Sequence, residues 1–267
     1  MNVARTSTRL LRHVFLSAMV AFLLMPVLAV VPASLTRYSF ITLPPDQVSL
    51  RWYSVFFADL DWVRSFITSF EVAIIATALS VTLGMLAAIG LERCSSRIRS
   101  LVLGLILSPL IVPVIMTAIS LYYVGRLIGT HGTVLGMALG HTIMCLPFAV
   151  INIGVSLKAL DRTLLRAAEG MGAGPWRVFR TVTVPIVFPG LAGGAAFAFI
   201  TSFDEVVISI FLAGVRVKTL PVKMWETIRV EFTPVTAVAS VLLVGLTLIM
   251  FIIIQWFRYR QCSRRSA

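Results

Sequence analysis

Long apolar runs separated by short polar segments are the main pattern along this chain. Each run is about 20 residues or longer, which is enough helix to cross a hydrocarbon core of about 30 Å. The pattern therefore predicts six membrane-spanning helices in one transmembrane domain over residues 1–267. We expect these spans at residues 14–34, 66–91, 101–124, 134–157, 186–212 and 235–257.

The first run, 14–34, has two possible interpretations. It follows Arg5, Arg9 and Arg12, and a Val-Pro-Ala sequence before Ser34 resembles a signal-peptide cleavage site. The run is longer than the roughly 7 to 15 apolar residues of a signal core, which favours a retained span.

Prolines and glycines mark two other spans. Pro109 and Pro113 break the backbone hydrogen-bond ladder of the third span, which is tolerated where other helices or a cavity satisfy the backbone. This favours the wall of a pore or cavity, and a kinked structural helix is the alternative. Gly132, Gly136 and Gly140 recur every four residues into the fourth span and predict close helix packing. In the loop at 213–234 we expect partial re-entry or a surface helix.

Composition excludes an ordinary soluble protein. Of 267 residues, 58% are hydrophobic, and mean hydropathy is +0.96. The net charge of +12 comes from short basic clusters beside the apolar runs, a pattern that indicates membrane topology and argues against nucleic-acid binding. About two-thirds of the 23 lysines and arginines fall on the side that carries both termini, which predicts cytoplasmic termini.

Candidate metal or redox chemistry is sparse. The three cysteines, Cys94, Cys145 and Cys262, are far apart in the sequence and indicate neither a disulfide framework nor a zinc site. His141 lies alone in the fourth span, where a hydrogen-bonded packing role is the usual one, and we assign it no chemistry.

The longest polar interruption in the second half, residues 158–185, predicts a helix, a tight glycine turn and a second helix. The first helix has an apolar face at three- and four-residue steps, formed by Leu160, Leu164, Leu165 and Ala168. The sequence Gly172-Ala173-Gly174-Pro175 should end it, because glycine tolerates left-handed dihedrals. Pro185 and Pro189 are expected to end the second helix. Such a unit should dock into a groove on a soluble partner.

The fifth span carries a polar stripe of Thr201, Ser202, Asp204, Glu205 and Ser209, in which Thr201, Glu205 and Ser209 recur at four-residue steps along the expected helix. A carboxylate inside a membrane is costly unless it meets water, a cation or a base. Two interpretations remain open: a pathway for a cationic substrate, or a structural pair with an arginine of a neighbouring subunit.

The polar loop resembles the EAA loop of binding-protein-dependent ABC importer permeases. Ala167 and Ala168 match its alanine pair, Gly172 its signature glycine and Pro185 its closing proline. Arg166 stands where that family usually has glutamate, and an acid follows only at Glu169. The resemblance implies contact with an ATPase through Arg166, Ala167, Ala168, Glu169, Gly172 and Ala173.

Two further segments, 202–209 and 219–226, resemble the spermidine and putrescine type of these permeases, specifically the second permease subunit. The resemblance implies an all-α integral membrane fold with six spans in the bacterial inner membrane. It also implies a transport function for polyamines or a similar small cation, with no enzymatic activity. The implied partners are an ATP-binding subunit dimer, a second permease subunit and an extracytoplasmic solute-binding protein.

The sequence has no Gly-x-x-x-x-Gly-Lys-Ser/Thr loop, so we expect ATP and Mg to bind the partner ATPase, with no cofactor or metal on this chain. The alternatives are an ion-coupled carrier that uses Asp204 and Glu205, or an ABC permease for a different small solute. A membrane enzyme would need a cluster of nucleophile, base and metal ligands, which the sequence does not present.

Overall fold

A computed structural model describes residues 2–41, 43–231 and 233–265, with side chains described for 12–41, 43–231 and 233–253. The described residues form helices joined by short connections. These are α1 (Asn2–Ser34), α2 (Arg51–Ala58), α3 (Leu60–Arg93), α4 (Ser96–Leu107), η1 (Ser108–Leu110), α5 (Val114–Leu127), α6 (Val134–Lys158), α7 (Arg162–Gly170), α8 (Pro175–Val178), η2 (Phe179–Thr183), α9 (Val184–Phe203), α10 (Val207–Leu212), α11 (Leu220–Val230) and α12 (Pro234–Arg265).

The chain divides into two compact units, and the first comprises Met1–Val63 and Met224–Leu246. In this unit, the connection between α1 and α2 is held by two polar contacts. The hydroxyls of Ser34 and Tyr53 lie 3.0 Å apart, and Trp52 Nε1 donates to the carbonyl of Tyr38 at 3.0 Å. These contacts fix the end of α1 against α2.

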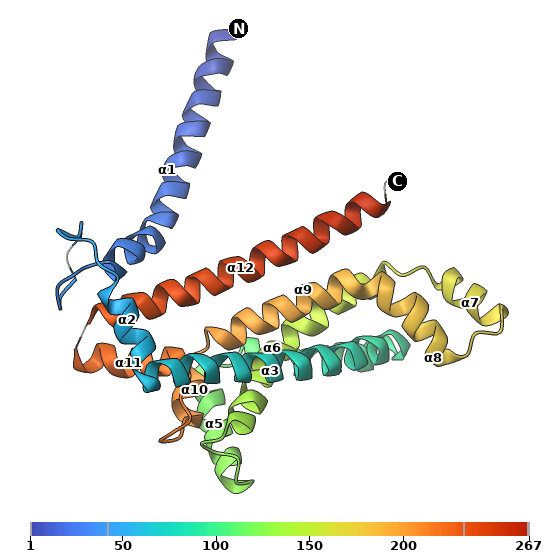
Figure 1. The fold of residues 1–267 in the computed structure, drawn as a ribbon. Helices are drawn as coiled ribbons and strands as arrows, with labels where there is room; N and C mark the ends of the chain where they lie inside the picture. The colour runs from blue at the N-terminus through green and yellow to red at the C-terminus, as the bar shows by residue number, and fades with distance from the viewer. Residues whose placement is uncertain (1, 42, 232, 266–267) are drawn as a thin grey trace. The chain divides into compact units, whose positions relative to one another are not determined.

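The second unit, Arg64–Lys223 and Thr247–Ala267, is organised around the antiparallel pair α6 and α9, with α3 alongside. Figure 1 shows these three helices running together, with α7 and α8 at one end. A Cβ added at Gly84 would lie 2.9 Å from Ala149 Cβ, and one added at Gly194 would lie 3.2 Å from Ala149 Cα. The three helices therefore meet at Ala149, where only small residues fit.

Five of the described helices are long and apolar enough to cross a membrane. A sixth span arises if the pair Ser96–Leu110 and Val114–Leu127 is counted as one, although the two pieces are bent by 97°. The interruption expected at the prolines of the span 101–124 is therefore present, as a sharp bend between two helices. Pro109 lies in the 3-10 turn η1 and Pro113 caps α5, so the ladder of backbone hydrogen bonds stops between them.

The fifth span differs from the expectation at both ends. Pro185 and Pro189 do not end a helix, because α8, η2 and α9 form one helix over Pro175–Phe203. The Val184 N–H donates to the Phe179 carbonyl five residues back, a π turn directly before Pro185, which has no N–H to donate. At the other end, the helix stops at Phe203 and α10 begins at Val207, so the continuous span 186–212 is wrong.

The glycine repeat before and within α6 produces close packing, as expected. A Cβ at Gly140 would lie 2.5 Å from Leu212 Cδ1 and 3.2 Å from Ile208 Cγ2, so α10 sits directly against this glycine. A Cβ at Gly136 would collide with the carbonyl oxygen of Thr130. The loop at 213–234 contains the helix α11, whose first residues are buried.

Candidate functional site

The first candidate site is the loop at residues 158–185, which begins with a capped helix. Asp161 is the N-cap of α7, and its Oδ1 accepts a hydrogen bond from the Thr163 N–H at 2.8 Å. This bond from the backbone of Thr163 lowers the pKa of the Asp161 carboxyl, because it stabilises the ionised form. Leu160, expected on the apolar face of this helix, lies before the N-cap. Aspartate is a preferred N-cap residue, so Asp161 is a sequence signal for the helix start.

The end of α7 is a Schellman motif centred on Gly172. The Gly172 N–H donates to the Glu169 carbonyl at 2.9 Å, and the Ala173 N–H donates to the Ala168 carbonyl at 3.1 Å. Gly172 has φ of +81°, the left-handed conformation that this motif requires and that glycine adopts without strain. The turn then leads into Pro175 at the start of α8. Gly172 is therefore the residue that sets the angle at which the two helices meet.

The loop divides its apolar side chains between the protein and the exterior. Ala168 is buried, whereas Leu164 is 48% exposed, Trp176 71% and Met171 82%. Arg166 is also exposed, as are Ala167 and Glu169. The expected apolar face is thus partly used within the chain, and a second apolar surface with a basic neighbour remains uncovered in this chain alone.

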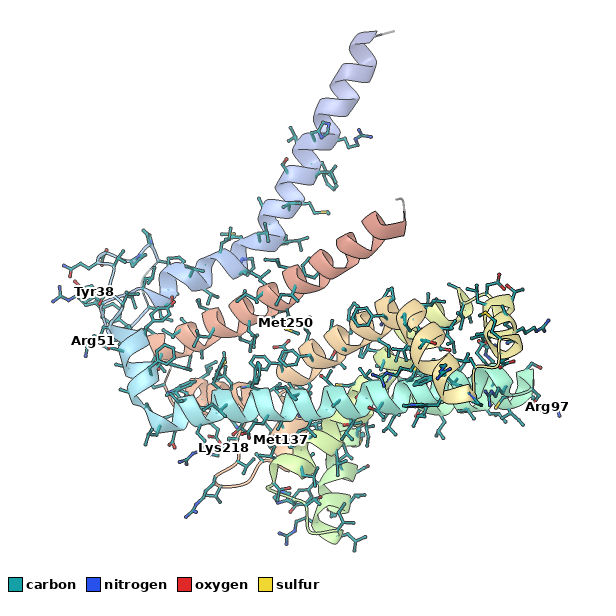
Figure 2. The ribbon with its side chains drawn as sticks, turned by 45° about the vertical axis from the view of Figure 1, so that its right-hand side comes forward. Tyr38, Arg51, Arg97, Met137, Lys218 and Met250 are labelled. Carbon is teal, nitrogen blue, oxygen red and sulfur yellow. The ribbon has the colours of Figure 1, made fainter. Side chains whose placement is uncertain are left out.

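A carboxylate at the end of α3 connects this loop to its surroundings. Glu92 Oε2 lies 3.1 Å from a guanidinium nitrogen of Arg162 at the start of α7. Glu92 Oε1 lies 3.4 Å from a guanidinium nitrogen of Arg99 in α4. Figure 2 shows Arg97 of α4 at this end of the unit. Glu92 therefore connects α3, α4 and α7. The sequence did not indicate the contact with α7, because Arg162 lies seventy positions after Glu92.

The second candidate site is the break between α9 and α10. Glu205 Oε1 accepts from the Ile208 N–H and Oε2 from the Ser209 N–H, both at 2.9 Å. The Glu205 carboxylate therefore caps the start of α10. The prediction that Thr201, Glu205 and Ser209 form one stripe at four-residue steps on a continuous helix is wrong, because residues 204–206 are not helical.

His141, the lone histidine of the fourth span, lies at this break. The ring is fully buried, with Nδ1 2.8 Å from Ser202 Oγ and Nε2 2.9 Å from Ser209 Oγ. Nε2 also lies 3.6 Å from Glu205 Oε2. The packing role expected for this histidine is confirmed, but its partners could not be read from the sequence, since they lie more than sixty positions further along the chain.

Asp204 differs from its neighbour. Its side chain is exposed, and within the described part of the chain its carboxylate makes no hydrogen bond or ion pair. Thr201, one turn earlier, is half-buried. The structure thus separates the two acids: Glu205 is engaged by backbone N–H groups, while Asp204 presents an unengaged carboxylate at the point where the helix stops.

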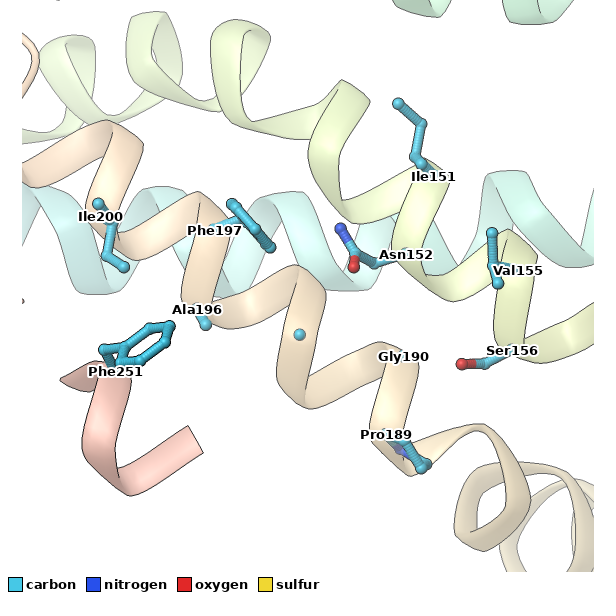
Figure 3. Close-up of a pocket in the computed structure, with 11 residues that line it drawn as sticks. Ile151, Asn152, Val155, Ser156, Pro189, Gly190, Ala196, Phe197, Ile200 and Phe251 are labelled. Atoms are coloured by element: carbon cyan, nitrogen blue, oxygen red, sulfur yellow. The ribbon is translucent and has the colours of Figure 1, made fainter. Parts of the chain in front are cut away.

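A cavity of about 390 Å³ lies along α6 and α9, between the break and the loop. Figure 3 shows the side chains of Asn152 and Ser156 directed toward it from α6, with Pro189 and Phe197 on α9. Asn152 is partly engaged, because its Nδ2 donates to the Phe148 carbonyl at 2.8 Å. The lining has no charged side chain, so this cavity offers a cation only weak polar contacts.

The sequence matches a known protein family. The sequence pattern that defines the family described as "Binding-protein-dependent transport system inner membrane component" matches residues 80–261, which include the loop and the helix break. The chain belongs to this family. It is therefore a multi-pass permease of the inner membrane and a transport subunit of an ABC importer, in which ATP hydrolysis belongs to a separate subunit.

Relatives cover nearly the whole permease. It is 30% identical over 245 residues to the spermidine/putrescine transport system permease protein PotC of Escherichia coli, covering 91% of this chain and 92% of that protein. It is 29% identical over 252 residues to the putrescine transport system permease protein PotI of the same organism, covering 91% and 89%.

The permease also resembles a solved structure, that of a bacterial ABC transporter involved in the import of the acidic polysaccharide alginate. The TM-score is 0.73 at 15% identity, with 96% of this chain and 97% of that chain covered. The similarity shows the fold alone, which is the all-α ABC importer permease fold that the sequence predicted. The fold therefore does not by itself indicate the solute.

Proposed function

We propose that this permease is the second of two permease subunits in an ATP-driven importer of polyamines, such as spermidine or putrescine, or of a similar small cation. The observation that carries the proposal is the exposed, unengaged carboxylate of Asp204 at a helix break, in a chain similar over nearly its full length to spermidine and putrescine permeases. An ammonium group hydrogen-bonded to a carboxylate gains about 1.5–3 kcal/mol. A neutral solute lacks the attraction between opposite charges, and an acidic solute is repelled.

The substrate pathway in this proposal includes Thr201, Asp204, Glu205 and Ser209. Asp204 contacts the cation, and Thr201 lies one turn before it on α9. Glu205 and Ser209 act through the shape of the break, since their polar atoms are engaged with α10 and His141. Asp204 and Glu205, which the sequence analysis grouped together, therefore have different roles: Asp204 binds the cation and Glu205 shapes the break.

Coupling in this proposal occurs at the loop between α6 and α9, where Arg166, Ala167, Ala168, Glu169, Gly172 and Ala173 contact the ATPase. The partners are an ATP-binding subunit dimer, a second permease subunit in a heterodimer and an extracytoplasmic solute-binding protein. ATP and Mg bind the ATPase and no cofactor binds this chain. The loop and both termini face the cytoplasm, in agreement with the excess of basic residues on that side.

The mechanical part of the proposal rests on the continuity of Pro175–Phe203, a 29-residue helix. Closure of the ATPase dimer displaces α8, and an unbroken helix carries that displacement to its far end. Asp204 is the first residue beyond that end. ATP binding at the loop is thereby linked to the exposure of the cation-binding carboxylate, which is what alternating access requires.

Uptake by the purified complex in proteoliposomes tests the proposal. Asp204→Asn keeps the shape of the side chain and removes its charge, so we expect uptake of labelled spermidine to fall at least tenfold while the yield of assembled complex stays unchanged. Asp46→Asn is the matched control, because it removes an exposed carboxylate between α1 and α2 and should leave uptake unchanged. Wild-type uptake by Asp204→Asn, or equal competition by a neutral sugar, would contradict the proposal.

A further inference from the structure

The buried imidazole of His141 joins the two sides of the helix break. Ser202 precedes the break on α9 and Ser209 follows it on α10, and one ring contacts both hydroxyls at 2.8 and 2.9 Å. His141 itself lies on α6, outside the broken segment. The position of residues 204–206 is therefore fixed by hydrogen bonds to α6, a neighbouring helix that is not broken at this point.

One assignment of protons satisfies this network with a neutral ring. The Ser209 hydroxyl donates to the Glu205 carbonyl at 3.0 Å, because a carbonyl oxygen can only accept. Having used its single proton, Ser209 Oγ must accept from His141, so Nε2 carries the hydrogen. Nδ1 of the neutral ring then accepts from the Ser202 hydroxyl. In this assignment the ring donates one hydrogen bond to Ser209 and accepts one from Ser202, so both of its nitrogens are hydrogen-bonded.

The packing around His141 leaves little freedom for another arrangement. At the preceding residue, a Cβ on Gly140 would lie 2.5 Å from Leu212 Cδ1, so α6 and α10 are in close contact. One turn later, Cys145 Sγ donates to the Ala198 carbonyl at 3.2 Å, which fixes α6 against α9. The close approach of α6 and α10 at Gly140, next to His141, therefore holds the imidazole at the break.

We propose that His141 is the positioning residue that holds the break open in a fixed geometry and so sets the position of the Asp204 carboxylate for the incoming cation. This inference rests on the proposed role of Asp204. Glu205 is less accessible to a solute than Asp204, because its side chain is only 9% exposed and each carboxylate oxygen accepts a backbone hydrogen bond from α10. His141 therefore acts on the solute only through Asp204.

Three substitutions distinguish positioning from simple packing. His141→Ala removes both contacts, whereas His141→Asn places an amide near the Nδ1 position and His141→Gln places one near the Nε2 position, so each keeps one bond. We expect His141→Ala to raise the spermidine concentration for half-maximal uptake at least tenfold. His141→Asn and His141→Gln should raise this concentration less. Cys145→Ala is the packing control. It removes another buried bond between α6 and α9, and half-maximal uptake should stay unchanged.

A double-mutant cycle with Asp204→Asn is the decisive measurement. If His141 acts through Asp204, His141→Ala should have little further effect on uptake in the Asp204→Asn background. Additive losses would overturn the inference and leave the cation site intact. Normal uptake by Asp204→Asn alone would remove the cation site and the inference with it. Failure of all three His141 variants to assemble, with normal assembly of Cys145→Ala, would assign His141 to folding alone and also overturn it.

Discussion

Replacing Gly172 should uncouple ATP hydrolysis from transport without preventing membrane insertion. Gly172 has φ of +81° at the C′ position of the Schellman motif that ends α7. A Cβ added there would have no neighbour within 4 Å, so the cost of a side chain is backbone strain alone. That cost is about 1–2 kcal/mol for an ordinary L-residue and higher for a β-branched one.

A penalty of this size changes the population of the turn by roughly 5- to 30-fold. We expect activity to follow the order Gly, Asn, Ala, Val at position 172, because asparagine tolerates the left-handed region better than alanine does. Gly170→Ala is the matched control. Gly170 is helical and its added Cβ also meets nothing within 4 Å, so alanine there should stabilise α7 by about 0.5–1 kcal/mol.

The assay is substrate-stimulated ATP hydrolysis together with uptake by the reconstituted complex, with assembled yield measured in parallel. Gly172→Val should lose both activities at normal yield, and Gly170→Ala should keep both. Full activity of Gly172→Val would show that the turn does not transmit the ATPase motion. Equal losses in both variants would point to general damage to the loop and refute the argument from φ.

Four other predictions concern the charges. Arg166→Glu should reduce co-purification with the ATPase, most at low salt, because its basic charge is expected to face a neutral or acidic patch; unchanged co-purification at all salt concentrations would remove it from the interface. Glu205→Gln should destabilise the folded complex by about 1–3 kcal/mol and so lower its yield, because an amide nitrogen cannot accept the backbone hydrogen bonds that the carboxylate accepts. A normal yield would contradict this capping role. Glu92→Gln should weaken coupling slightly and only at low salt, since partly exposed pairs such as that with Arg162 contribute about 1 kcal/mol or less; a large loss in high salt would contradict it. The folded pKa of Asp161 is below its unfolded pKa of 3.8, so its stabilising effect is present above pH 3.8 and is lost as the pH falls through the folded pKa. Protection of the Thr163 amide from hydrogen exchange should therefore be constant at roughly pH 6 to 8 and should drop only in acid.

The sequence predicted the local features of the loop. The apolar repeat before Gly172 and the Gly-Pro pair after it determine a helix, a left-handed exit and a new start, and each depends only on neighbouring residues. The positive φ of Gly172 is found as expected. The role of the loop in coupling stays a prediction.

The breaks in the third and fifth spans were harder to predict. Proline alone does not decide between a kink and an end: Pro113 begins a new helix after a sharp bend, whereas Pro185 is accommodated by a π turn. The stop after Phe203 has no proline or glycine to announce it. It is stabilised by Glu205 and by His141 from α6, and contacts between distant residues leave no periodic signal in the sequence.

The source of energy tests the central claim most directly. The complete importer, reconstituted with its ATPase, second permease and binding protein, should take up labelled spermidine only with ATP on the ATPase side. Uptake should persist when proton and sodium gradients are collapsed. Uptake without ATP, driven by either gradient, would contradict the account and would identify an ion-coupled carrier that uses Asp204 and Glu205.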